Sequence, residues 1–122
     1  MIDNPIAFQV AALAGGFNIH LTQFKDIEMY GRGVSRLDLP VFFELFHHVL
    51  NYDGSDVLFS IERPTLVIAG EKDAITPVKF QKELANKVEG AEYHLIPYGS
   101  HCTHLDFPEL VNYKIRDFLE RL

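Results

Sequence analysis

PTLVIAGEKD, residues 64–73, is the stretch that decides the fold of this chain. A proline precedes a continuous apolar run over Thr65–Ala69, and Gly70 ends that run. A short uninterrupted run of this kind is typical of a strand that is buried on both faces in a parallel sheet. The polar residues that follow, ending at Asp73, are therefore expected in the loop at the carboxyl end of the strand.

The residues after this strand alternate between helical and extended patterns. Thr76, which precedes a proline, is expected to cap a helix that ends before Gly90. Glu92–Ile96 is expected to be a second strand, and Asp106 and Glu109 predict a capping-box start for a last helix. The order strand, helix, strand, helix predicts a right-handed crossover between two parallel strands, so the fold class is α/β.

The first strand carries no charge, proline or bulge signal that would protect its edge from pairing with another strand. We therefore expect a further neighbour for it. That neighbour would come from a second copy of the chain, from a complementing chain, or from the N-terminal segment.

The sequence pattern of the first half of the chain predicts helices that are joined by longer irregular segments. Ile6–Ala14 is expected to be a short helix closed by glycines. Residues 17–36 are expected to be a loop that leaves room for one short helical piece, because glycines interrupt a weak periodicity. Asp38 predicts the N-cap of a helix over Leu39–Leu50 that buries a broad aromatic stripe. Residues 57–62 are then expected to be a linker.

The composition is that of an ordinary acidic globular domain. The 122 residues are 48% hydrophobic and 23% charged, and their net charge of −6 argues against a nucleic-acid partner. No apolar run has the length of a membrane span, and the N-terminus lacks a secretory pattern, so we expect no membrane association. The single cysteine, Cys102, excludes an internal disulfide and predicts a reducing, cytoplasmic location.

Asp73 and His101 each follow one of the two expected strands, so parallel pairing would bring their loops to one edge of the sheet. A carboxylate bonded to one imidazole nitrogen fixes the tautomer, and the other nitrogen can then accept a proton from a nucleophile. The alternative is that Asp73 only starts a turn and that His101 is an ordinary polar loop residue.

Other groups of residues are weaker candidates for a functional site. The cluster His101, Cys102 and His104 matches no zinc spacing, and no phosphate-cradling glycine loop supports a flavodoxin-like module, so we expect neither metal nor cofactor. Cys102 is expected to be a buried apolar thiol. Phe42 and Phe46 are candidates for lining a substrate pocket, and core packing is the alternative for both.

Two motifs carry a family resemblance. RPTLVIAGEKDAITP at residues 63–77 and IPYGSHCTHLDFPE at residues 96–109, followed by an amphipathic helix, resemble the C-terminal third of an α/β-hydrolase. The resemblance implies a partial α/β-hydrolase fold, with a C-terminal core unit over 57–122 and a helical, lid-like segment over 1–56. It also implies that Asp73 is the triad acid and that His101 is the triad base.

The family's nucleophile elbow, Gly-x-Ser-x-Gly between a strand and a helix, is not found, and the chain is expected to begin after it. Neither Ser35 nor Ser100 has the elbow spacing. We therefore expect a C-terminal portion of a hydrolase for small ester-like substrates, which supplies the acid and the histidine, and we expect the isolated chain to be inactive. Thioester, lactone and other reactions of the family stay open. The alternative is a non-catalytic, truncated module that self-associates or pairs with another chain through its sheet edge.

Overall fold

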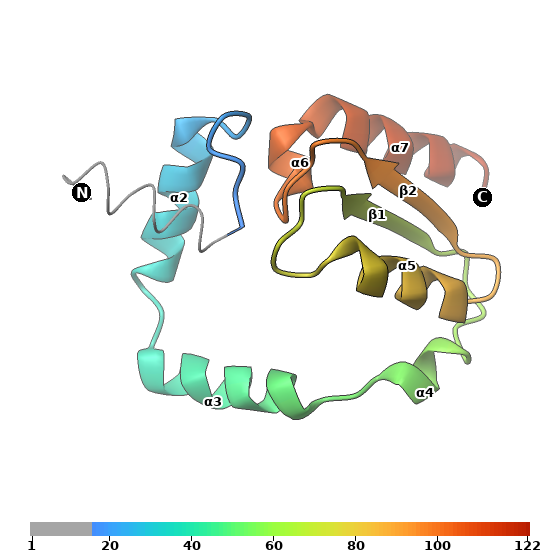
Figure 1. The fold of residues 1–122 in the computed structure, drawn as a ribbon, viewed down its shortest axis with the longest axis horizontal. Helices are drawn as coiled ribbons and strands as arrows, with labels where there is room; N and C mark the ends of the chain where they lie inside the picture. Colours follow the sequence, from blue (N-terminus) through green and yellow to red (C-terminus); the bar gives the residue numbers. More distant parts are fainter. Residues whose placement is uncertain (1–15) are drawn as a thin grey trace.

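The structure is a computed structural model that describes residues 16–122 (Figure 1). The helix expected over Ile6–Ala14 lies outside the described residues. The helices and strands are, in chain order, α2 (Phe24–Val34), α3 (Leu39–Asn51), α4 (Ser55–Leu58), β1 (Leu66–Gly70), α5 (Val78–Lys87), β2 (Glu92–Ile96), α6 (Thr103–Asp106) and α7 (Pro108–Glu120).

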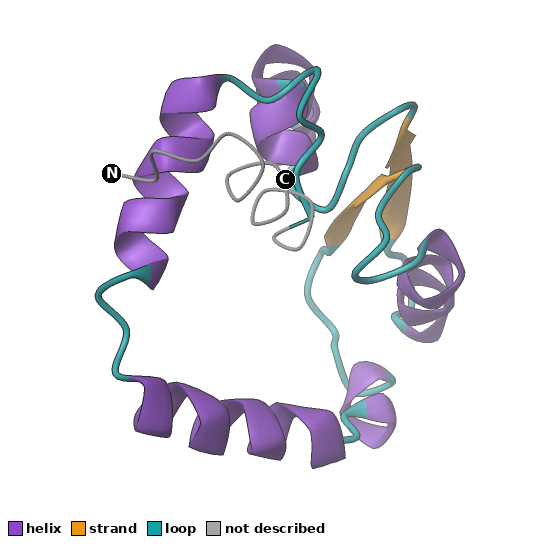
Figure 2. Ribbon diagram, turned by 60° about the vertical axis from the view of Figure 1, so that its left-hand side comes forward, coloured by secondary structure: helices purple, strands orange, loops and turns teal. Residues whose placement is uncertain are grey.

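The centre of the fold is a parallel pair of strands. β1 and β2 pair in a register that sets Leu66 opposite Glu92 at one end and Gly70 opposite Ile96 at the other. The connecting helix α5 covers one face of the pair and α7 covers the other, so the strands lie between two helical layers (Figures 1 and 2). The predicted α/β arrangement of two parallel strands with a helical crossover is therefore confirmed.

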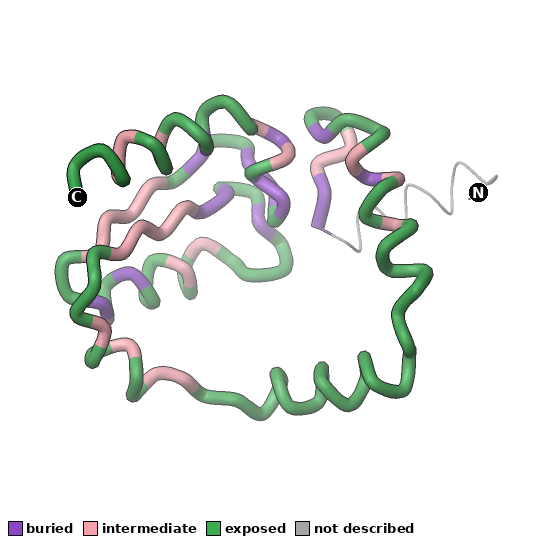
Figure 3. The backbone as a smooth tube through the Cα atoms, turned by 180° about the vertical axis from the view of Figure 1, so that it is seen from behind, coloured by how far each residue is buried: buried purple, intermediate pink, exposed green. Residues whose placement is uncertain are grey.

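The core of this unit lies between the strands and their two helices (Figure 3). Ala69 and Ile96 are fully buried on the strands, Ala85 and Val88 come from α5 and its end, and Val111 comes from α7. Burial of a large aliphatic side chain contributes about 1.5–3 kcal/mol relative to exposure. The ends of the strands that lead into the two polar loops are thus the best anchored part of the sheet.

Residues 17–36 are more helical than expected, because the one helical piece that the prediction allowed for is α2, a helix of 11 residues. A buried contact holds it: Ile27 packs in a small cluster with Phe17, whose ring also meets Tyr30 edge to face at 5.0 Å. An ion pair from Arg32 to Glu28, one turn apart, lies on the exposed side. Tertiary packing therefore outweighs the cost of the two glycines in the helix.

The helix expected over Leu39–Leu50 is confirmed as α3, and the Asp38 carboxylate accepts a hydrogen bond from the Val41 amide at 3.2 Å, as its role as N-cap requires. The expected burial of its aromatic stripe is wrong. No residue of α3 is buried, and Phe42 and Phe46 are 40% and 48% exposed. Periodicity shows which side chains form an apolar face, but it does not supply an element to cover that face.

Three smaller expectations at helix ends also fail. α4 replaces the start of the predicted linker, because Asp53 accepts a hydrogen bond from the Ser55 amide at 2.9 Å and so favours a helical turn there. Neither Thr76 nor Asp106 caps a helix: α5 begins after Pro77, and α7 begins after Phe107, both without a side-chain cap. The side chains of Thr76 and Asp106 are instead bonded to other partners.

The first residues of β1 are half-buried, and within residues 16–122 its strand partner is β2 alone. A further neighbour for this edge therefore stays a prediction. None of the described helices combines the length and the apolar character that a membrane crossing needs.

Candidate active site

Asp73 lies in the loop that leaves the carboxyl end of β1, and its carboxylate organises that loop. Oδ1 accepts hydrogen bonds from the amides of Ile75 and Thr76 at 2.9 and 2.8 Å. An aspartate that accepts from backbone groups two and three residues ahead stabilises a tight turn. The turn fixes the carboxylate, whose side chain is 4% exposed.

The other carboxylate oxygen, Oδ2, accepts from two side chains. The Thr76 hydroxyl donates to it at 2.8 Å, and Nε2 of Gln81, on α5, donates at 2.9 Å. Gln81 Nε2 also donates to the Thr76 carbonyl oxygen. Because both of its partners are acceptors, the Gln81 amide has one orientation that satisfies them. Thr76 and Gln81 thus hold the Asp73 carboxylate from two sides.

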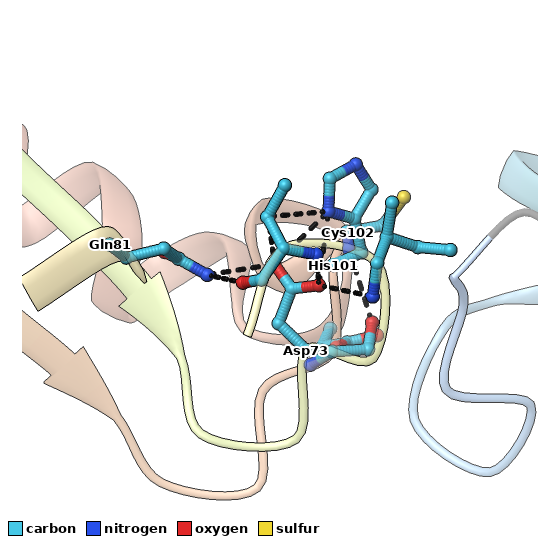
Figure 4. A network of polar contacts seen from close by, with 8 residues as sticks. Asp73, Gln81, His101 and Cys102 are labelled. Carbon is cyan, nitrogen blue, oxygen red and sulfur yellow. Dashed lines mark hydrogen bonds and ion pairs between the residues drawn. The ribbon is translucent and has the colours of Figure 1, made fainter. Parts of the chain in front are cut away.

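His101 supplies the fifth donor to this carboxylate. Its Nδ1 lies 3.0 Å from Oδ2 and 3.2 Å from Oδ1 of Asp73. Figure 4 shows Gln81 and His101 reaching the carboxylate from different sides. A carboxylate only accepts, so Nδ1 must carry the proton, and Nε2 of the neutral ring keeps its lone pair. The His101 side chain is 38% exposed, which leaves it open to a reacting group.

The electrostatics favour a charged Asp73. Burial alone would raise the pKa of its carboxyl group, but hydrogen bonds from Thr76, His101 and Ile75 outweigh burial and lower the pKa below its usual value. Hydrogen bonds to an ionised acceptor are roughly twice as strong as neutral ones. The carboxylate therefore stays an anion at neutral pH and holds the histidine through a charged hydrogen bond.

The two loops meet because Gly70, the last residue of β1, has no side chain. A Cβ atom at this position would lie 2.2 Å from the carbonyl oxygen of Ser100 and 2.6 Å from that of Gly99. The Lys72 amide then donates to the Gly99 oxygen at 2.7 Å, which joins the Asp73 loop to the His101 loop. The backbone contact sets the separation at which Asp73 and His101 can bond.

The expected substrate-binding residues are not brought to this place. Phe42 and Phe46 stack on each other with ring centroids 5.9 Å apart on α3. No hydrogen bond or ring contact within residues 16–122 links either ring to Asp73 or His101. A pocket role for Phe42 and Phe46 therefore stays a prediction.

Cys102 is buried directly after His101, and burial, with help from nearby carboxylates, raises the pKa of its thiol. A raised pKa lowers the thiolate fraction and disfavours a nucleophilic role. The Ser100 hydroxyl accepts from the Cys102 amide at 3.2 Å, and the Ser35 hydroxyl donates to the Arg32 carbonyl at 2.9 Å. Over the described part of the chain, no serine hydroxyl is hydrogen-bonded to His101.

A hollow of about 470 Å³ lies elsewhere, between α4 and α5. Its wall includes the apolar side chains of Phe80 and Leu84 and the Lys87 ammonium group, which donates to the Ser55 hydroxyl at 3.0 Å. Neither member of the Asp73–His101 pair lines it. The Asp73–His101 pair and this hollow therefore belong to different parts of the surface.

Sequence reasoning located Asp73 and His101, but it missed two residues that complete the site. Thr76 was assigned to a helix cap, although its spacing of three from Asp73 is also that of a side chain facing an aspartate turn. Gln81 lies eight residues after Asp73, and no local pattern connects the two. The structure brings all four side chains together, while their catalytic role stays a prediction.

Comparison with known sequences finds no family model that matches, but it finds individual relatives. The chain is 38% identical over 60 residues to serine hydrolase BPHL of Mus musculus, covering 49% of this chain and 21% of that protein. It is 36% identical over 70 residues to proline iminopeptidase PfmaB of Pestalotiopsis fici, covering 57% and 25%. The chain thus spans about a quarter of the length of these relatives.

Solved structures give the same picture. A thermophilic esterase from Thermogutta terrifontis, in a malate-bound form, matches with a TM-score of 0.54 and 31% identity over 57% of this chain and 25% of the esterase. Est816, described as an N-acyl homoserine lactone degrading enzyme, matches with a TM-score of 0.51 and 41% identity over 52% and 25%. The resemblance in sequence and the resemblance in fold therefore each cover about half of this chain.

Proposed function

Because this chain belongs to the α/β-hydrolase superfamily and matches a C-terminal fragment of its members, we propose that Asp73 and His101 are the acid and the base of a hydrolytic triad. The substrate class in this proposal is a small ester-like molecule. The observation that carries it is the 3.0 Å contact between His101 Nδ1 and Asp73 Oδ2.

In the proposed reaction, Nε2 of His101 accepts the proton of a nucleophilic hydroxyl as that oxygen attacks the substrate carbonyl. The resulting imidazolium is stabilised by the Asp73 anion and then gives its proton to the leaving group. A water molecule then attacks the acyl intermediate with the same proton transfers through His101, which releases the acid and restores the hydroxyl. The nucleophile and the oxyanion donors would come from outside the described residues.

The test is a chimera in which residues 57–122 replace the corresponding segment of mouse serine hydrolase BPHL, to which this chain is 38% identical over 60 residues. We expect the chimera to react with a fluorophosphonate probe and to hydrolyse p-nitrophenyl esters. His101→Ala should abolish turnover, whereas His104→Ala, at an exposed position three residues away, should retain it. A folded chimera whose turnover survives His101→Ala would overturn the proposal.

The expectation that this chain does not supply the nucleophile is tested separately with the chain alone. Removing the nucleophile and the oxyanion donors from a triad enzyme removes nearly all of its rate acceleration, since these groups act as a unit. We expect no turnover of p-nitrophenyl esters by the purified chain. Turnover that His101→Ala abolishes would show that the chain supplies its own nucleophile.

A second candidate function is that of a non-catalytic module that self-associates or pairs with another chain. The half-buried edge of β1, which has β2 as its one strand partner within residues 16–122, favours it. Light scattering after size-exclusion chromatography is the measurement. A monomer at all concentrations would exclude self-association, and an oligomer without fluorophosphonate labelling would support this candidate.

The remaining parts of the proposal rest on the sequence. A division into a lid-like segment over 1–56 and a core unit over 57–122 stays a prediction. So does a cytoplasmic location, for which the single Cys102 is the argument. Fluorescence microscopy of a tagged full-length protein tests the location, and a signal confined to a membrane-bound compartment would contradict it.

A further inference from the structure

We propose that Asp106 is a positioning residue for His101, because its buried carboxylate ties the His101 loop to residues 16–22. The inference rests on the proposed function of His101 and adds a residue that acts through it. Asp106 is 8% exposed and lies at the end of the short helix α6, five residues after the histidine.

Each oxygen of the Asp106 carboxylate has its own donor. Oδ2 accepts the Ser100 amide at 2.6 Å, and Oδ1 accepts the Thr22 hydroxyl, which is buried and comes from 84 residues away in the chain. A buried carboxylate is costly unless donors satisfy it, so both contacts are needed to keep this one in place. The Ser100 amide is held on the N-terminal side of His101.

The residues after His101 are held as well. The amides of Leu105 and Asp106 donate to the Cys102 carbonyl oxygen at 2.8 and 3.1 Å, and the Cys102 amide donates to the Ser100 hydroxyl at 3.2 Å. Asp106 therefore closes a ring of hydrogen bonds that begins and ends next to His101. The backbone that carries the imidazole cannot shift without breaking this ring.

Residues 16–22 form a strap along the same loop. The Gly16 carbonyl oxygen accepts the Cys102 amide at 3.4 Å, and the Asn18 side chain donates to the Tyr98 carbonyl at 3.5 Å. Gly16 has a φ of +74°, and a Cβ there would lie 2.6 Å from the Cβ of His101. The strap thus lies directly against His101, and the bond from Thr22 to Asp106 secures its far end.

The two donors suggest substitutions that separate geometry from charge. In Asp106→Asn, the amide oxygen can accept from Ser100, and the amide nitrogen can donate to Thr22, whose hydroxyl also accepts. Both contacts survive, and the charge is lost. Asp106→Ala removes both contacts, and Thr22→Val removes one of them while keeping the shape of the side chain.

The experiment measures the tautomer of His101 in the ¹⁵N-labelled chain by long-range ¹H–¹⁵N correlations at mildly basic pH. We expect the Nδ1–H form in the wild type and in Asp106→Asn. We expect a mixture of both tautomers in Asp106→Ala, and a smaller shift of the same kind in Thr22→Val. Val111→Ala, a buried change in α7, is the control for general destabilisation and should leave the tautomer unchanged.

An unchanged tautomer in Asp106→Ala, or an equal mixture in Val111→Ala, would overturn the proposal. If Asp106→Ala does not fold, Thr22→Val decides, because an unchanged tautomer in that variant would also overturn it. The readout needs no catalysis, so an inactive BPHL chimera would refute the proposed function and leave this result standing. A chimera that carries only residues 57–122 does not contain Thr22, so it tests the bond from the Ser100 amide alone. In an active chimera, loss of that bond in Asp106→Ala should lower kcat by about 10- to 100-fold with KM unchanged, as expected for a misplaced catalytic group.

Discussion

Replacing Asp73 by asparagine tests the charge at the centre of the site. The carboxylate accepts from the donors described above: the Ile75 and Thr76 amides, the Thr76 hydroxyl, Gln81 Nε2 and His101 Nδ1. Asparagine keeps one oxygen for the two backbone amides. Its amide nitrogen then replaces Oδ2 and faces the Gln81 donor without a bond.

The expected loss of stability follows from this inventory. Two amide bonds that change from charged to neutral acceptors lose about 0.5–1 kcal/mol each. A donor left facing another donor costs about 1–3 kcal/mol when it is buried, and less at the half-buried Gln81. The sum predicts that Asp73→Asn lowers the free energy of unfolding by about 2–4 kcal/mol at neutral pH.

The stability difference between wild type and Asp73→Asn should depend on pH, and the lowered pKa of Asp73 sets the direction of that dependence. The folded-state pKa of Asp73 is lowered, so its stabilisation is fully present above the unfolded-state value of about 3.9 and is lost as the pH falls through the folded-state value. The difference between wild type and Asp73→Asn should therefore hold from neutral pH down to about pH 4 and should shrink below it.

Urea unfolding at neutral pH and at about pH 3, monitored by circular dichroism, measures both the loss of stability and its pH dependence. Glu89→Gln removes an exposed carboxylate and should leave stability nearly unchanged at both pH values. Equal stability of wild type and Asp73→Asn at neutral pH would refute the argument from hydrogen bonds. A difference that persists unchanged at acid pH would refute the argument from charge.

Three further outcomes follow from the same geometry. His101 should change to the Nε2–H tautomer in Asp73→Asn, since Nδ1 then faces a donor, and ¹⁵N shifts that stay as in the wild type would contradict this. Gly70→Ala should lower the free energy of unfolding by about 1–3 kcal/mol through its clash with backbone oxygens, whereas Gly33→Ala, in open space on α2, should be neutral or stabilising in the same urea experiment. Cys102 should react with iodoacetamide at least about tenfold more slowly in the native chain than in urea, because burial raises the pKa of its thiol, and equal rates would contradict that.

The second half of the chain was predictable because its signals are local. The apolar run over Thr65–Ala69 lies within one residue of β1, and Glu92–Ile96 coincides with β2. Parallel pairing then follows from the helix between them, and it places the two loops at the carboxyl ends of the strands. The positions of Asp73 and His101 could therefore be predicted from the sequence.

The residues that donate hydrogen bonds around the site could not be predicted from the sequence. Asp106 was expected to cap the last helix, yet its partner Thr22 is 84 residues away, and no sequence pattern reports a pairing over that distance. The same holds for Gln81, whose contact with Asp73 depends on where α5 starts. Polar side chains near helix starts serve as caps or as loop supports with the same local spacing, and tertiary structure decides between them.

The prediction for the first half of the chain failed for a different reason. It assumed a surface that covers the apolar face of α3, and the described residues do not provide one. α3 is strongly apolar, and a helix of that kind is stable in water only when another surface covers it. The edge of β1 has an equivalent need for a strand. The sequence predicted burial of the α3 stripe and a further neighbour for β1, and neither is found within residues 16–122. One partner that covers α3 and pairs with β1 would satisfy both, so binding of such a partner should protect β1 amides and α3 amides from hydrogen exchange together.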